Sequence, residues 1–75
     1  MPIDIEIFGQ LIQAGEPRRR TLQLEEPSTA RSLAQTLGLD EATIWMVTID
    51  GGQGNLDDVV RSGSRLCFFP YLSGG

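Results

Sequence analysis

The sequence predicts an α+β fold in which a mixed sheet of four to five strands carries one main helix on one face. Two short runs alternate apolar and polar residues with the period of two of a half-buried strand, and two more are almost wholly apolar. Between them, one stretch repeats apolar residues with helical spacing and is too short to be stable without a sheet to pack on. The 75 residues make a single domain.

The first two strands are expected at residues 3–7 and 21–25. Residues 3–7 alternate isoleucine with a carboxylate, and residues 21–25 place two leucines on one face. Residues 9–17 contain two glycines and a proline and are typical of a loop, so the two strands form a long-looped hairpin. Phe8 falls on the parity of the polar face.

The helix is expected from Ser28 or Thr29 to about Gly38. Either hydroxyl can accept a hydrogen bond from an unpaired amide of the first turn. Gly38 supplies the left-handed residue that commonly follows the end of a helix. The apolar stripe has the spacing i, i+3, i+4, i+7 and consists of Ala30, Leu33, Ala34 and Leu37. We expect Leu33 and Leu37 to pack against the sheet residues Ile5, Leu22, Leu24 and Val47.

The second half of the chain predicts two further strands. Residues 44–49 are apolar and largely β-branched, which indicates a strand covered on part of both faces. Residues 50–55 have the composition of a turn, and residues 55–60 are expected to form a single helical turn. Residues 65–69 form the last strand, which Pro70 stops.

Strand, strand, helix, strand, short turn and strand is the order of the β-grasp fold, the fold of ubiquitin. We expect the domain to span residues 1–72, followed by a flexible Ser-Gly-Gly tail at residues 73–75. One helix covers only one face of such a sheet, which leaves the other face to water or to a partner.

Composition excludes several functions. The net charge of −4 argues against nucleic acid as a partner, and the one basic cluster, residues 18–20, is expected to be a solvated strand start. One cysteine and no histidine exclude an internal disulfide, most zinc sites and histidine acid–base chemistry. There is no signal-peptide pattern and no apolar run long enough to cross a membrane, so a cytoplasmic location is expected. All six basic residues are arginine.

Three groups offer conventional chemistry, each with a plainer alternative. Asp57 and Asp58 could bind a metal but are better interpreted as solvated surface, since adjacent residues do not face each other on a helix. Residues 51–54 resemble a phosphate-binding loop but lack its Lys-Ser/Thr, which favours a hairpin turn. Cys67 lies among apolar strand residues with no histidine to activate it, which favours an inert thiol over a nucleophile.

The C-terminal glycines are the remaining candidate. Without a Cβ atom, Gly74 and Gly75 can extend through a narrow channel. A terminal carboxylate has a pKa of about 3.5, so it is ionised at pH 7 and unreactive until it is activated, for example as a mixed anhydride with AMP. An activating enzyme must supply ATP and Mg²⁺, so we expect the chain to be a cosubstrate and not an enzyme.

The ending resembles that of the small subunit of molybdopterin synthase, the MoaD family of sulfur carriers to which the thiamin carriers (ThiS) are similar. That family ends in an apolar pair, two prolines, valine and Ser-Gly-Gly; here Tyr71 and Leu72 replace the second proline and the valine. Residues 7–11 resemble its Phe-Ala-x-Leu segment, and residues 62–66 its turn into the last strand. The matching ending is Phe68, Phe69, Pro70, Tyr71, Leu72, Ser73, Gly74 and Gly75.

The resemblance implies a mechanism and a set of partners. A ubiquitin-activating-type adenylyltransferase adenylates Gly75, a sulfur donor protein converts it to a thiocarboxylate, and the large synthase subunit uses that sulfur to build molybdopterin. No cofactor is expected on this chain, and neither nucleic acid nor membrane is expected as a partner. The partner-binding residues are expected to be Phe8, Phe69, Pro70, Tyr71, Leu72 and Ser73, with Met46 near the two phenylalanines on the open face.

Two other functions compete with this one. The chain could be a carrier for thiamin or tungsten-pterin synthesis, or an archaeal-type ubiquitin-like modifier joined to protein amines. It could also be a β-grasp interaction module without terminal chemistry. The mass of the protein from its host discriminates between them, because a thiocarboxylate, a conjugate and an unchanged tail differ in mass.

Overall fold

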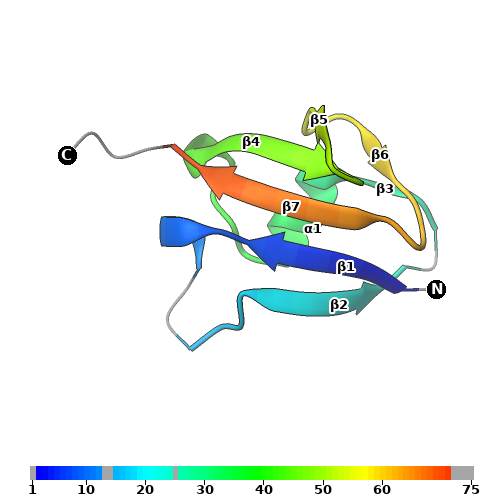
Figure 1. The fold of residues 1–75 in the computed structure, drawn as a ribbon, viewed down its shortest axis with the longest axis horizontal. Coiled ribbons are helices and arrows are strands. Elements are labelled where there is room, and N and C mark those ends of the chain that lie inside the picture. Colours follow the sequence, from blue (N-terminus) through cyan, green and yellow to red (C-terminus); the bar gives the residue numbers. More distant parts are fainter. Residues whose placement is uncertain (1, 13–14, 25, 72–75) are drawn as a thin grey trace.

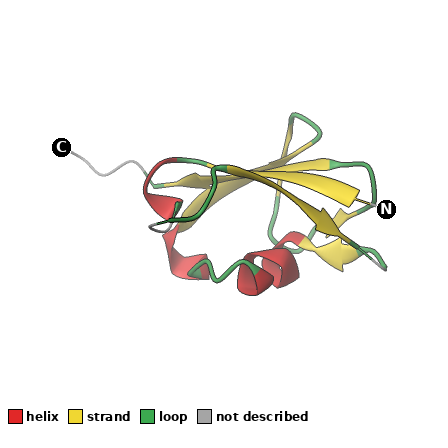
Figure 2. Ribbon diagram, turned by 90° about the horizontal axis from the view of Figure 1, so that it is seen from below, coloured by secondary structure: helices red, strands yellow, loops and turns green. Residues whose placement is uncertain are grey.

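A mixed five-stranded sheet forms one layer of the molecule, and α1 (Ala30–Thr36) lies against one face of it (Figures 1 and 2). The computed structural model describes residues 2–12, 15–24 and 26–71. The strand order is β2-β1-β7-β4-β5; β1 and β7 are parallel in the centre, and the other pairs are antiparallel. The strands are β1 (Pro2–Ile7), β2 (Arg19–Gln23), β4 (Ile44–Ile49), β5 (Gly52–Gly54) and β7 (Arg65–Pro70).

Two short strands and two 3-10 turns complete the fold. β3 (Ser28–Thr29) and β6 (Val59–Val60) pair antiparallel as a second small sheet. The 3-10 turns are η1 (Gly9–Leu11), which follows β1, and η2 (Glu41–Thr43), which precedes β4. No helix in the described part of the chain has both the length and the hydropathy that crossing a bilayer requires.

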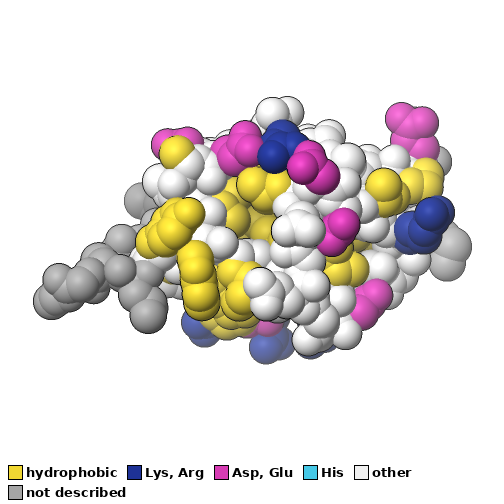
Figure 3. All heavy atoms as spheres, turned by 90° about the horizontal axis from the view of Figure 1, so that it is seen from above, with side chains coloured by type: hydrophobic (Ala, Val, Ile, Leu, Met, Phe, Trp, Pro, Cys, Tyr) yellow, Lys and Arg dark blue, Asp and Glu magenta, His cyan; other side chains and the backbone are white. Residues whose placement is uncertain are grey.

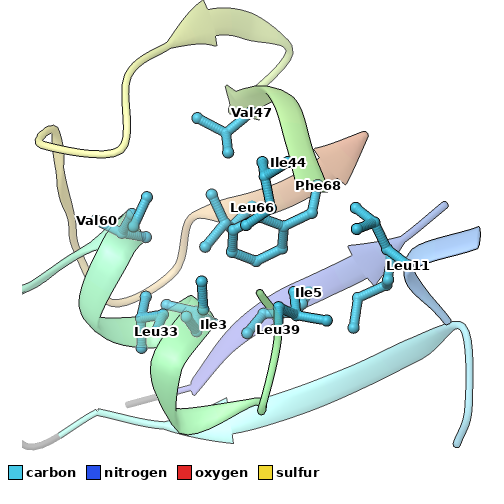
Figure 4. Close-up of a cluster of buried hydrophobic side chains, with 13 residues drawn as sticks. Ile3, Ile5, Leu11, Leu33, Leu39, Ile44, Val47, Val60, Leu66 and Phe68 are labelled. Atoms are coloured by element: carbon cyan, nitrogen blue, oxygen red, sulfur yellow. The ribbon is translucent and has the colours of Figure 1, made fainter. Parts of the chain in front are cut away.

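The core lies between the sheet and α1. The three isoleucines of β1 are almost fully buried, as their alternation predicts. The Phe68 ring is inaccessible to solvent and lies among side chains from β1, β4 and the turn after α1 (Figure 4). The expected helix–sheet packing is confirmed, since one cluster joins Leu33 to Ile5 and Val47, with partly buried Leu22, Leu24 and Leu37 against it.

The helix has the ends that the sequence predicts. Thr29 is the N-cap, and its Oγ1 accepts a hydrogen bond from the Ser32 amide at 3.1 Å. Gly38 follows the last turn with φ +77°, the left-handed conformation in which glycine carries no steric penalty. Arg31 bonds to Glu41 and to Asp57, which ties α1 to η2 and to the turn before β6. These hydrogen bonds, the one to Glu41 first, raise the pKa of the Arg31 guanidinium.

The helical turn expected at residues 55–60 is wrong. Residues 59–60 form β6, and Val60 is fully buried in the core. Residues 55–58 do form one turn, closed by the Asp58 amide donating to the Asn55 carbonyl at 3.0 Å, but Val59 and Val60 leave it because they pair with β3. The β-branched valines then favour an extended strand over a helix. This turn also occupies Asp57 and Asp58, the first with Arg31 and the second with Asn55.

The glycine-rich segment is a hairpin, as expected, although part of it is also a strand. Asp50 and Gly51 both have positive φ, +54° and +84°, which is the pattern of a two-residue turn whose twist matches that of the flanking strands. Residues 52–54 then pair with β4 as the edge strand β5. β2 also differs from its expected position: it spans Arg19–Gln23 in place of residues 21–25, because its pairing with β1 already begins with Arg19 opposite Glu6.

Candidate functional site

The face of the sheet opposite α1, called the outer face below, carries an aromatic pair at the end where β7 finishes. Along β7, Phe68 points into the core and the next residue, Phe69, is only partly buried. Phe8 comes directly after β1 and is held beside it, because the Phe8 amide donates to the Phe68 carbonyl at 3.1 Å. The rings of Phe8 and Phe69 are stacked, with centroids 4.6 Å apart and planes 6° from parallel. Such offset stacking is a favourable arrangement for two aromatic rings.

Met46 extends this pair across the sheet. It is the partner of Phe69 in the β4–β7 ladder and is also partly buried, so the three apolar side chains form a row on the outer face. The sequence placed Phe8 on the polar parity of β1 and expected these three residues together on the open face. They do lie together there. That this row binds a partner remains a prediction.

Arg18 borders the aromatic pair, and Arg19 shares with it the same carboxylate partner. The Arg18 guanidinium carbon lies 5.0 Å from the centroid of the Phe8 ring, within the range of a cation–π contact. Its Nε is 3.8 Å from Glu6 Oε2, and Arg19 Nε is 3.5 Å from Glu6 Oε1. Sequence reasoning treated residues 18–20 only as a solvated strand start. The contact with Phe8 depends on the β1–β2 register, for which the residue pattern gives no signal.

Gly9 and Pro70 fix the point from which the C-terminal residues leave the sheet. Gly9 has φ +58°, and a Cβ atom built on it would be 3.0 Å from Pro70 Cγ. Gly9 is therefore required both by its backbone angle and by its contact with the end of β7. Sequence reasoning assigned Gly9 to a loop and missed this contact.

Tyr71 is the last described residue, and 58% of its surface is exposed. It follows Pro70, the last residue of β7, directly. The other expected site residues, Leu72, Ser73, Gly74 and Gly75, lie outside the described residues. The domain boundary expected at residue 72 lies there too, one residue beyond the last described position.

Trp45 is an exposed aromatic residue that the sequence analysis did not single out. A register irregularity between Ile44 and Met46 in the β4–β7 pairing turns Trp45 outward, and 53% of its surface is accessible. It lines a hollow of about 320 Å³ with its two neighbours and Leu56. Figure 3 shows hydrophobic side chains gathered toward the end of the molecule where β4 begins. This exposure could not be predicted from the largely apolar residues 44–49, because the alternation of buried and exposed positions breaks at the irregularity.

Cys67 shares the outer face but is covered. It lies in β7 between Glu6 of β1 and Thr48 of β4, and only 9% of its surface is exposed. The thiol thus has little access to a substrate, in agreement with the interpretation as an inert, partly buried residue.

The chain has the β-grasp fold that its sequence predicts. SAMP1 from Haloferax volcanii is similar over 100% of both chains, with a TM-score of 0.74 and 20% identity. A chain of the complex of subunits 1 and 2 of molybdopterin-converting factor from Helicobacter pylori 26695 is similar over 100% of both chains, with a TM-score of 0.63 and 15% identity. No protein-family model matches the sequence, and no curated protein matches it. At these identities the likeness establishes the fold.

Proposed function

We propose that this protein is a sulfur carrier and that Gly75 carries the sulfur as a C-terminal thiocarboxylate. In this function the chain is the small subunit of a molybdopterin synthase and donates sulfur to a pterin precursor. It is not itself an enzyme. Catalytic residues belong to the activating enzyme and to the large subunit, and ATP and Mg²⁺ are bound by the activating enzyme. The setting proposed is the cytoplasm.

The observation that carries the proposal is the position of the Gly-Gly sequence relative to the aromatic pair. β7 ends at Pro70, beside Phe8 and Phe69, and five residues follow it in the sequence. Five extended residues span at most about 17 Å. If a partner covers the aromatic pair, Gly75 can therefore reach an active site that lies up to about 17 Å from Pro70. The glycines at positions 74 and 75 have no side chains to obstruct entry.

The chemistry requires one displacement at phosphorus and a second at the carbonyl carbon of Gly75. First, a carboxylate oxygen of Gly75 attacks the α-phosphorus of ATP, and pyrophosphate leaves. Then a sulfur nucleophile, supplied by the donor protein as a persulfide, attacks the acyl-adenylate carbon and AMP leaves. A thiol then attacks the donor-side sulfur of the resulting acyl disulfide, so that the S–S bond breaks, the thiocarboxylate leaves, and the donor remains as a disulfide with that thiol. In this proposal each of these steps takes place on a partner.

The direct test is a mass measurement on the chain ending at Gly75. Incubation with the ubiquitin-activating-type enzyme of the same host, ATP, Mg²⁺ and a sulfur donor should raise the mass by about 16 Da, the difference between sulfur and oxygen. A variant with one alanine added after Gly75 should stay at its original mass. Conjugates on other proteins in the same mixture would instead identify a ubiquitin-like modifier. An unchanged mass in the wild-type chain would leave only an interaction module.

A further inference from the structure

Two arginines share one carboxylate beside the aromatic pair. Arg18 and Arg19 both approach Glu6, at 3.8 and 3.5 Å, and these are the ion pairs that the described residues give to either arginine. Glu6 is only 13% exposed, whereas Arg18 is 57% and Arg19 75% exposed. A partner approaching this end of the outer face therefore meets two guanidinium groups and little of the carboxylate between them. This leaves a local excess of positive charge on a chain whose net charge is −4.

The ion pairs of Arg18 and Arg19 with Glu6 are weak enough for a partner's carboxylates to compete with them. Exposed pairs at such distances contribute little to stability, because water screens them and the side chains lose freedom in making them. A guanidinium group has five N–H donors, and a single carboxylate cannot satisfy those of two arginines. Carboxylates on a partner could therefore bond to Arg18 and Arg19 without first breaking a strong contact.

Arg18 joins this charge to the apolar row. Its guanidinium lies over the Phe8 ring, and the same ring stacks on Phe69. The three side chains form one connected surface in which a cation borders two aromatic rings. Arginine and large aromatic side chains are the residues most often responsible for binding energy at protein interfaces.

The neighbouring surface is hollowed. A depression of about 290 Å³ lies alongside Glu6 and Arg19. Its lining holds three arginines and two carboxylates, namely Arg19, Arg20, Arg65, Asp4 and Glu6, and the Thr21 hydroxyl donates to Asp4. An acidic side chain of a partner would find room there next to Arg19, because the arginines of the lining outnumber its carboxylates.

We propose that Arg18 and Arg19 extend the pair Phe8 and Phe69, already expected to bind a partner, into a docking surface for a protein that presents an apolar contact bordered by carboxylates. Charge complementarity selects this partner: the apolar row seats against apolar side chains, and the arginines pair with the bordering acidic groups. The overall negative charge of the chain would repel a uniformly acidic partner, so docking is confined to the face on which the arginines lie. This inference rests on the proposed function, because the activating enzyme is the partner that is tested.

The test measures ATP–pyrophosphate exchange by the host's activating enzyme as a function of carrier concentration, at 50 and 500 mM NaCl chosen to span weak and strong screening (about 14 and 4 Å). Arg18→Gln/Arg19→Gln keeps two long polar side chains but removes both charges. We expect its KM to rise at least about fivefold at low salt with kcat unchanged, and its dependence on salt to fall. The wild-type KM should rise with salt.

Arg61→Gln is the matched control, since it removes one arginine charge from an exposed position in the turn before β7 and should leave KM within about twofold. If the double variant melts well below the wild type, Arg18→Lys/Arg19→Lys replaces it and must keep the wild-type dependence on salt. An unchanged KM in the double variant, or a wild-type KM insensitive to salt, would overturn the docking surface alone. Exchange absent with the wild type would overturn the proposed function as well.

A second copy of this chain is the competing occupant, because its surface is rich in carboxylates. Sedimentation equilibrium of the wild type, at concentrations up to about tenfold above the measured KM, distinguishes the two. We expect a monomer. A dimer that Arg18→Gln/Arg19→Gln dissociates would show that the surface serves self-association and would contradict docking of an acidic partner.

Discussion

Gly9 and Pro70 touch at the point where the last strand ends, so closely that a β-carbon on Gly9 would lie 3.0 Å from Pro70 Cγ. Gly9 also has a positive φ, which side chains rarely tolerate. The segment after β1 and the end of β7 are thereby held in one arrangement, and the aromatic pair is built on that arrangement. The contact links the geometry of the docking surface to the point at which the chain leaves the sheet after β7.

Gly9→Ala should destabilise the fold by about 2–4 kcal/mol, the sum of a left-handed backbone on a residue with a β-carbon and a clash with Pro70. Gly15→Ala is the control, since Gly15 has φ +83° but nothing within 4 Å of its β-carbon position. Urea unfolding should show a smaller loss for Gly15→Ala. Equal losses in the two variants would mean that the contact with Pro70 contributes nothing.

Leu33→Ala should cost about 2–5 kcal/mol, because Leu33 is buried between α1 and the sheet and its loss leaves a cavity. The free energy of unfolding of a domain of this size is only a few kcal/mol, so the variant should be partly unfolded at room temperature. Leu37→Ala, at a partly buried position on the same stripe, should cost less in the same denaturation experiment. A Leu33→Ala variant as stable as the wild type would contradict the observed packing.

Phe8→Ala should weaken partner binding more than folding. Phe8 is partly exposed and contacts Phe69 and Arg18, so its removal takes away an interface side chain and leaves the core cluster intact. We expect KM for the activating enzyme to rise at least about tenfold, whereas the free energy of unfolding should fall by roughly 1 kcal/mol. Val59→Ala is the control on β6, where the exposed apolar residue lies outside the docking face. A KM unchanged by Phe8→Ala would remove Phe8 from the interface.

The absence of lysine limits what an activated Gly75 can react with on another copy. The sequence contains six arginines and no lysine, so these 75 residues offer no side-chain amine to an activated Gly75. Incubation with activating enzyme, ATP and a sulfur source should give thiocarboxylated monomer on a reducing gel. A ladder of multimers that survives reducing agent would count against a carrier and favour a polymerising modifier.

The elements fixed by local pattern were the ones that the sequence predicted well. The helix follows from its stripe, from Thr29 as N-cap and from Gly38, and β4 begins and ends at the expected residues because both its ends are marked by polar or turn residues. The helical turn expected at residues 55–60 failed because the pairing of β6 with β3 and the burial of Val60 depend on tertiary contacts that a short segment does not reveal.

The candidate site was predictable as a set of residues but not as an arrangement. The parity of Phe8 placed it on the outer face, and the position of Phe69 one residue before Pro70 placed it at the strand end. The approach of Arg18 to Phe8, the contact of Gly9 with Pro70 and the outward turn of Trp45 each depend on register between strands far apart in sequence. Sequence alternation carries no information on that register.

The central claim is tested most directly by deleting Gly74 and Gly75 and measuring ATP–pyrophosphate exchange with the host's activating enzyme. Both residues follow the last strand, and neither has a side chain to contribute to packing, so the melting temperature should change by no more than about 1 °C. We expect exchange to fall to the level measured without carrier, because the deletion removes the carboxylate that attacks ATP from the position where the enzyme holds it. Exchange undiminished in the truncated chain would contradict the assignment of Gly75 as the reactive group.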